Sequence, residues 1–154
     1  DFEARILPYL QSSGVLPATP STAQLELLHK LAPLVQERIT VLSEASGMLG
    51  FMFVADDQLS YEEDAIAQLP ENSKLIIETA IAALKDLSDF TTDAIQAKLS
   101  EALADGLGEK PRNAFGPIRT AFSGRRVTPP LFECMEFLGK ESSISRLEAF
   151  ASSR

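Results

Sequence analysis

Helical spacing of apolar residues is the feature that most limits the fold of this 154-residue chain. No stretch alternates apolar and polar residues convincingly with the period of a β-strand, whereas apolar residues recur at helical intervals from end to end. A clear example follows Ser21 and Thr22, either of which suits a helix N-cap. Its apolar face comprises Leu25, Leu28, Leu31 and Val35. The sequence therefore predicts an all-α fold.

We expect about eight to ten short helices, with no linker long enough to separate two independent domains. The helical patterns cover residues 1–14, 21–36, 37–49, 60–69, 70–87, 91–108, 112–124, 129–139 and 142–153. Thr91 or Thr92 suits the N-cap of the sixth pattern. Pro33 is expected to kink or split its helix, and Gly116–Pro117 to break another, because proline lacks the N–H that continues a helix. The apolar stretch 51–54 has no partner strand and is predicted to be a buried irregular link. The helices are expected to form two sub-bundles, residues 1–90 and 91–154.

Charge is distributed unevenly along the chain, whose formal net charge is −8. Residues 107–131 contain five basic residues and one acid, whereas the rest contains nine basic and 21 acidic residues. The five basic residues are Lys110, Arg112, Arg119, Arg125 and Arg126. A polarised acidic protein of this kind is a poor non-specific nucleic-acid binder, so any nucleic acid must meet one face.

The basic segment suggests single-stranded RNA as a ligand. Arg119 follows a helical pattern whose apolar residues face inward, so its guanidinium is expected to point outward. Arg125 and Arg126 follow Gly124 in what we expect to be a flexible turn, next to rigid proline and leucine surfaces. Arginines beside such surfaces can contact phosphates and support unstacked bases. The structural alternative is a solvated basic helix end that balances the helix dipole.

Catalytic and metal sites are not indicated. The chain has one histidine, His29, and one cysteine, Cys134, whose apolar neighbours predict a buried core thiol. No spacing of His, Cys and carboxylates suits zinc, and no glycine-rich loop follows a strand. No apolar run reaches the roughly 18 residues of a membrane span, so we expect no membrane partner and a cytoplasmic location.

The segment KPRNAFGPIRTAFSGRRVTPPLFECMEFLGKESSISRL (residues 110–147) strongly resembles the C-terminal end of bacterial glutamyl-tRNA synthetases. Residues 34–53 resemble the preceding helical domain of the same family. The resemblance is dense over 110–147, weaker over 55–105, and covers essentially the whole chain. It implies an all-α anticodon-binding cage, with tRNA(Glu) as the partner and no DNA. It also implies that both predicted sub-bundles belong to the anticodon-binding region, with the anticodon-loop segment in the second.

The family's anticodon contacts can be carried over to five positions. Arg38 matches the arginine that reads the third anticodon base, and its side chain is expected to point outward from a helix whose apolar face includes Ile39 and Leu42. Arg119 matches an arginine beside the anticodon loop. The loop that holds the first two bases matches Thr128, Pro129 and Leu131. A further family arginine has no counterpart near residues 99–101; Arg125 and Arg126 are candidates to replace it. Together with Lys110 and Arg112, they are the expected contacts to the tRNA backbone.

The family's catalytic half, which binds ATP and Mg²⁺, has no counterpart in these residues. The chain starts at Asp1 without Met, so we expect it to be a fragment of a longer protein. Because the catalytic half is missing, the fragment is expected to bind tRNA without charging it and to hold no cofactor or metal. It is also expected to be a monomer. Two alternatives remain open at this point. One is the related cage domain of a class I lysyl-tRNA synthetase, and the other is a helical protein-interaction module that docks an acidic partner on its basic strip.

Overall fold

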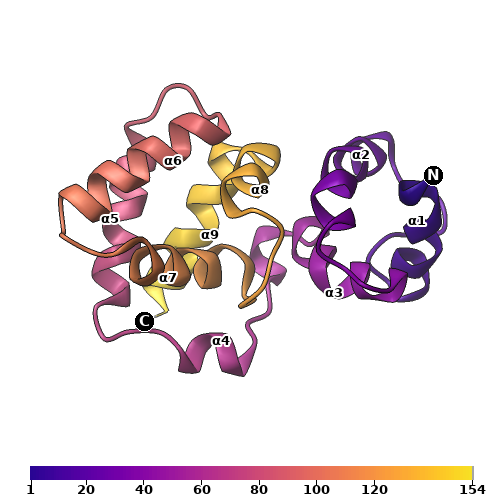
Figure 1. The fold of residues 1–154 in the computed structure, drawn as a ribbon, viewed down its shortest axis with the longest axis horizontal. Helices are drawn as coiled ribbons and strands as arrows, with labels where there is room; N and C mark the ends of the chain where they lie inside the picture. The colour runs from indigo at the N-terminus through magenta and orange to yellow at the C-terminus, as the bar shows by residue number, and fades with distance from the viewer. Residues whose placement is uncertain (154) are drawn as a thin grey trace.

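The computed structural model describes residues 1–153, apart from the side chains of residues 111 and 112. This part of the chain contains nine α-helices and no strand, which confirms the predicted all-α fold (Figure 1). The helices are α1 (Phe2–Ser12), α2 (Thr22–Gln36), α3 (Ala45–Leu49), α4 (Glu63–Ala67), α5 (Ser73–Lys85), α6 (Thr92–Ser100), α7 (Pro111–Ser123), α8 (Leu131–Leu138) and α9 (Lys140–Ser152). Across residues 1–153, no helix has the length and apolar content needed to cross a membrane.

Two of the predicted N-caps are confirmed by their hydrogen bonds. The Ser21 side chain accepts from the Gln24 N–H while the Gln24 side chain accepts from the Ser21 N–H, which forms a capping box at the start of α2. The Thr91 side chain accepts from the Ala94 N–H at the start of α6. Both caps satisfy N–H groups that the first helical turn leaves without partners.

The prolines and glycine expected to interrupt helices do not split them. Pro33 lies inside α2, and Gly116 and Pro117 lie inside α7, and both helices run on as single elements. Proline removes one hydrogen bond from a helix, at a cost of about 3 kcal/mol in an exposed interior. Here the neighbouring residues are buried on both sides of each proline: Leu31, Ala32 and Val35 in α2, and Ala114, Ile118 and Ala121 in α7. Tertiary packing therefore outweighs the local preference.

The predicted helix over 37–49 is wrong for its first half. Helix α2 ends at Gln36, and only a short 3-10 turn (Leu42–Glu44) precedes α3. Arg38 consequently lies just beyond the end of a helix and not within one. The predicted buried stretch without regular α-helix or strand is confirmed: residues Gly50–Phe53 form a 3-10 turn in which Phe51 and Met52 are buried.

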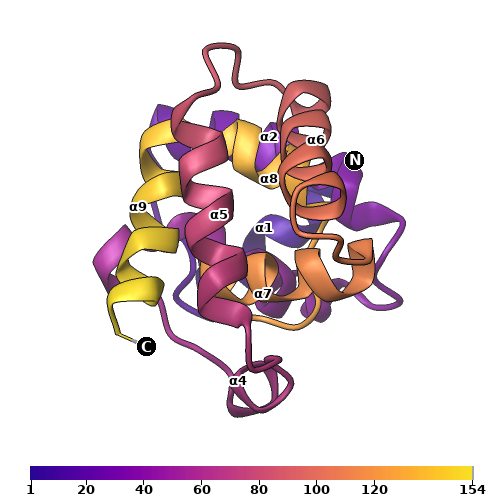
Figure 2. The ribbon, with the colours of Figure 1, turned by 90° about the vertical axis from the view of Figure 1, so that its left-hand side faces the viewer.

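The helices form two groups joined by the link at residues 50–60 (Figure 1). The N-terminal group contains α1, α2 and α3, and the C-terminal group contains α4 to α9. The division lies well before the expected boundary at residues 90 and 91. Helix α5 lies between α9 and α6 and also packs against α7, so it belongs with the C-terminal helices (Figure 2).

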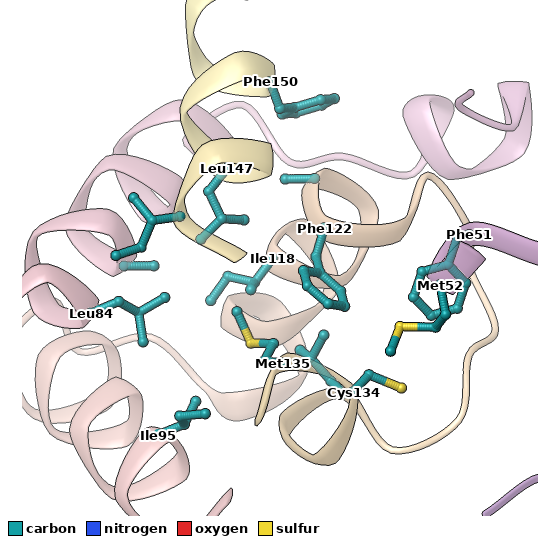
Figure 3. Close-up of a cluster of buried hydrophobic side chains, with 14 of the residues drawn as sticks. Phe51, Met52, Leu84, Ile95, Ile118, Phe122, Cys134, Met135, Leu147 and Phe150 are labelled. Carbon is teal, nitrogen blue, oxygen red and sulfur yellow. The ribbon is translucent and has the colours of Figure 1, made fainter. Parts of the chain in front are cut away.

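Side chains from the link complete the core of the C-terminal group (Figure 3). The rings of Phe51 and Phe122 meet edge to face with their centroids 5.9 Å apart. Cys134 is fully buried in the same core, which confirms the predicted structural thiol. The link is therefore fixed by packing on both sides, and α1 to α3 are attached through it.

Candidate nucleic-acid interface

The loop between α7 and α8, residues 124–130, begins with a glycine that no other residue can replace without strain. Gly124 ends α7 with φ = 74°, a conformation that L-residues with a Cβ rarely adopt. A Cβ added at this position would also overlap the backbone carbonyl oxygen of Ser60. The loop thus starts where two backbone segments, about sixty residues apart in sequence, lie in direct contact.

Four hydrogen bonds fasten this loop to residues 60–62. The Arg125 guanidinium donates to the Ser60 carbonyl (3.3 Å) and to the Ser60 hydroxyl (3.2 Å). The Glu62 N–H donates to the Gly124 carbonyl (2.8 Å), and the Arg126 N–H donates to the Glu62 carboxylate (3.2 Å). The expectation of a flexible turn is therefore wrong. Arg125 is half-buried and bound within the protein, whereas the Arg126 side chain is exposed.

Arg119 and Thr128 form the centre of the candidate interface. The Arg119 Nε donates to the Thr128 hydroxyl (3.2 Å), which in turn donates to the Pro129 carbonyl (2.7 Å). Thr128 is buried and Arg119 is half-buried. The sequence predicted that the Arg119 guanidinium would point outward into solvent, and the structure shows that it is partly enclosed instead. Burial lowers the pKa of Arg119. Among the ion pairs of the described residues, none includes Arg119.

The remaining loop positions divide into buried and exposed side chains. Pro129 and Leu131 are buried, so their side chains fix the path of the backbone and belong to the core. Val127 is 68% exposed and Arg126 is exposed beside it. A ligand of this loop would therefore meet Arg126, Val127 and the backbone groups, and not a shelf formed by the Leu131 side chain.

Arg38 belongs to the N-terminal group, and its charge, like that of Arg119, acts on Cys134 of α8. Its side chain is exposed, as predicted, and its Nη1 donates to the Leu34 carbonyl at the end of α2 (3.2 Å). Burial raises the pKa of the Cys134 thiol in α8 to about 12, and the charges of Arg119 and Arg38 oppose this rise. Both arginines therefore lie within electrostatic reach of the same residue of α8.

The described basic side chains of the segment 107–131 do not form one continuous cluster. Lys110 is exposed at the start of α7, and the 13 residues of this helix separate it by about 20 Å from Arg125 and Arg126. The Arg112 side chain lies outside the described residues. The positive charge is therefore divided between the two ends of α7, with Arg119 near the second end.

Two grooves flank the turn at Arg126. The first, of about 420 Å³, is lined by Arg119 and Arg126 together with the polar side chains of Gln68, Asn113 and Thr120. The second, of about 830 Å³, places Arg125 and Arg126 opposite Glu62, Glu63 and Asp64. Only the first groove offers positive charge without facing carboxylates. Gln68 and Asn113 were missed by the sequence reasoning, because nothing in their local sequence indicates that they approach Arg119.

Metal ligands are not gathered at these grooves within the part of the chain that the structure describes. Among the residues that the structure describes, no group of three or more His, Cys, Asp or Glu side chains could hold a metal ion. His29 lies far along the chain from the loop and pairs with Glu3 (2.8 Å) at the surface. The arrangement is therefore suited to binding an anionic or hydrogen-bonding ligand.

Comparison with known proteins identifies the family of the chain. Residues 1–151 match the family model described as an anticodon binding domain. Over 96% of its own length, the chain is 54% identical to a glutamate–tRNA ligase of Kineococcus radiotolerans. Over 97% of its own length, it is 49% identical to the glutamate–tRNA ligase of Kocuria rhizophila. It covers only 29% of each of these relatives.

Solved structures show the same fold at lower sequence identity. A glutamate tRNA ligase from Elizabethkingia meningosepticum, solved with its amino acid, superposes with a TM-score of 0.74 at 22% identity, over 99% of this chain and 30% of that one. The enzyme from Elizabethkingia anophelis gives a TM-score of 0.72 at 24% identity, over 99% of this chain and 29% of that one. With the match of the family model over residues 1–151, the chain belongs to the family of anticodon-binding domains.

Proposed function

We propose that the chain recognises the anticodon of tRNA(Glu) as part of a glutamate–tRNA ligase. The observation that carries the proposal is Arg119, a half-buried cation oriented by a neutral hydroxyl and lining a groove. A partly buried charge without an opposite charge costs stability until a ligand supplies electronegative atoms. The names of the relatives supply the class of ligand, which is a tRNA.

Arg119 is suited to contacting a base or a phosphate with its terminal nitrogens. The Nε is occupied by Thr128, which leaves the two NH₂ groups for a ligand. Because the hydroxyl fixes the plane of the guanidinium, the fork can form two parallel hydrogen bonds with little further loss of side-chain entropy. The first two anticodon bases lie against the loop in this proposal. The buried side chains of Thr128, Pro129 and Leu131 hold this loop in place, and its peptide groups face the bases.

Arg38 reads the third anticodon base in this proposal. Its bond to the Leu34 carbonyl uses one of the five N–H donors of the guanidinium. A paired contact to a base edge discriminates against a wrong base by about 1–3 kcal/mol, by analogy with readout in the major groove of DNA. Arg38 and Arg119 come from the two different helix groups, so the anticodon would bridge them.

Positions around the two ends of α7 contact the tRNA backbone. Arg126 is the strongest candidate because it is exposed and lines the groove with Arg119. Lys110 and Arg112 would contact phosphates farther from the bases. The Arg125 guanidinium already donates to Ser60, so Arg125 would contact a phosphate with its remaining N–H donors.

The chemistry of aminoacylation belongs to the rest of such a ligase. The chain spans about 30% of the length of its relatives. ATP, Mg²⁺ and glutamate would bind to a catalytic part outside these residues, and the present residues would position the tRNA as a monomer. We therefore expect that this chain alone forms no glutamyl-adenylate.

Substitution of Arg38 tests the proposal at the level of one base. Fluorescence anisotropy would compare tRNA(Glu) with a tRNA altered only at the third anticodon base, for the unmodified chain and for Arg38→Gln. The proposal expects the unmodified chain to prefer tRNA(Glu), and Arg38→Gln to lose about 1–3 kcal/mol of that preference. Equal weakening of both tRNAs would make Arg38 a phosphate contact and contradict its proposed role.

A further inference from the structure

Arg146 in α9 is the largest fully buried side chain of the described residues that carries a charge. It is 1% exposed, and all of its guanidinium nitrogens donate hydrogen bonds. Its Nε donates to the Asp56 carboxylate (2.7 Å), and its Nη2 donates to the Val54 carbonyl (3.0 Å). Neither the anticodon contacts nor the charge pattern of the segment 107–131 accounts for this residue.

One nitrogen of Arg146 joins the link to the C-terminal group. Nη1 donates to the Phe51 carbonyl in the link (2.9 Å) and to the Phe122 carbonyl in α7 (3.3 Å). The guanidinium carbon also lies 5.7 Å from the centre of the Phe122 ring, which itself meets Phe51 edge to face. Arg146, Phe51 and Phe122 therefore form a junction of α9, the link and α7.

The junction lies next to both halves of the proposed binding site. Phe122 comes three residues after Arg119, which is less than one turn of α7. Phe51 belongs to the link that carries α1 to α3, and with them Arg38. The position of Phe51 relative to Phe122, together with the direct packing of α2 against α8, therefore helps to place Arg38 relative to Arg119.

An arginine suits this junction better than other residues. Its planar fork donates in several directions at once to three carbonyls and one carboxylate, whereas a lysine is a single point of charge. A buried cation stabilises a fold only weakly compared with apolar residues of the same size, but it demands one geometry of its acceptors. Arg146 is therefore better suited to fixing a relative position than to adding stability.

We propose that Arg146 is a positioning residue for anticodon recognition, which holds the N-terminal group so that Arg38 meets the third base while Arg119 and the 124–130 loop hold the others. The proposal rests on the proposed function of Arg38. Base readout by a paired hydrogen bond requires placement within about 0.5 Å, which two groups joined by a loose link could not maintain. Among the described residues, the Arg125 guanidinium also binds the link, at Ser60, and the exposed Lys30 of the N-terminal group approaches the Phe137 ring of the C-terminal group (5.9 Å).

Variants of Asp56 and a lysine variant of Arg146 test the junction while a cation remains at position 146. Asp56→Ala deletes one acceptor at a partly exposed position, Asp56→Asn keeps an oxygen acceptor, and Arg146→Lys removes the fork. Glu148→Gln is the matched control, because it breaks the exposed ion pair of α9 with Lys85, which lies within the C-terminal group. Circular dichroism selects the variants that keep the helical fold.

Two measurements are then made on each variant. Distances between spin labels at positions 26 and 149, which are exposed in α2 and α9, report the placement of the two groups without tRNA. Anisotropy titrations with tRNA(Glu) altered at the first or at the third anticodon base report discrimination at each position.

Asp56→Ala and Arg146→Lys are expected to broaden the distance distribution and to lower discrimination at the third base about three- to tenfold, as for loss of one bond of a pair. Discrimination at the first base should stay within about twofold, because the C-terminal group keeps its own contacts. Asp56→Asn should restore most of both properties, and Glu148→Gln should change neither.

An unchanged distance distribution in Asp56→Ala and Arg146→Lys would overturn the proposal, as would an equal loss of discrimination at all bases. If the unmodified chain does not discriminate between tRNAs at all, the proposed function fails. In that case the distance distributions alone decide whether Arg146 fixes the two groups.

Discussion

The guanidinium of Arg119 is oriented by the hydroxyl of Thr128, whose Oγ1 lies 3.2 Å from the Arg119 Nε. A carboxylate in the place of this hydroxyl would neutralise the arginine, whereas a hydroxyl orients it and leaves its charge available. The same hydroxyl donates to the Pro129 carbonyl, so its position is fixed by the backbone of the loop.

Thr128→Val is expected to weaken tRNA binding about tenfold, or about 1.4 kcal/mol, the scale of one hydrogen bond to a charged group. Valine has nearly the shape of threonine but cannot accept from Arg119. Thr79→Val is the control, because the Thr79 hydroxyl donates to the Leu75 carbonyl in α5, away from the loop. Anisotropy titrations compare the two variants. Equal affinities for Thr128→Val and the unmodified chain would show that the orientation of Arg119 is unimportant.

Gly124→Ala is expected to lower the free energy of unfolding by about 3 kcal/mol or more, through positive φ and overlap with the Ser60 carbonyl together. Gly108 has nearly the same backbone angle (φ = 72°), but a Cβ there would meet nothing within 4 Å. Gly108→Ala should therefore cost only about 1 kcal/mol, from the backbone angle alone. Urea unfolding measures both values, and equal costs would contradict the close approach at Gly124.

Arg125 and Arg126 are expected to act differently although they are neighbours. Arg126→Ala should weaken binding of every tRNA alike and reduce the slope of log affinity against log salt by about 1 in magnitude. Arg125→Ala should instead destabilise the fold by about 1–2 kcal/mol, because it removes the bonds to Ser60. Salt titrations and urea unfolding separate the two effects. A larger change of salt slope for Arg125→Ala than for Arg126→Ala would reverse this assignment.

Burial of Cys134 predicts a dependence of stability on alkaline pH. Its pKa is raised to about 12 in the folded protein, above the value of 9.0 for a free thiol. The contribution of the protonated Cys134 thiol to the free energy of unfolding is therefore complete below pH 9. This contribution is lost between pH 9 and 12, because the unfolded chain releases the thiol proton first. The loss is about 1.4 kcal/mol per pH unit within this window.

Cys134→Ala serves as the comparison, because all other titrating groups are common to both proteins. The difference in unfolding free energy between the two proteins, measured from pH 8 to 10.5 by urea unfolding, should shrink above pH 9 as the unmodified protein loses its advantage. A difference that stays constant over this range would show that the folded thiol titrates normally.

Local sequence signals predicted those parts of the fold that depend on neighbouring residues. The caps at Ser21 and Thr91, the turn at Gly124 and the buried Cys134 follow from short patterns of residue types. The continuous helices at Pro33 and Pro117 could not be predicted in this way, since packing against distant residues overrides the local preference of proline.

The candidate site was only partly visible in the sequence, because its geometry depends on contacts between distant segments. Arg125 looks like a free surface cation beside Arg126, but Ser60 binds it across 65 positions of the chain. Arg146 stands in the sequence as a surface-like charge in a helix rich in serine, and its acceptors lie up to 95 positions away. The exposed position of Arg38, in contrast, was predicted, since the apolar residues that follow it face inward.

Binding of tRNA(Glu) with single changes in the anticodon tests the central claim most directly. Anisotropy titrations of the unmodified chain at low salt would compare tRNA(Glu) with three variants, each altered at one anticodon base. Recognition of the anticodon predicts weaker binding of the variants, by about 1–3 kcal/mol for the third base, with the same tRNA body in every case. Equal affinity for all four tRNAs would contradict anticodon recognition and leave only a basic surface that binds RNA, or any polyanion, without regard to sequence.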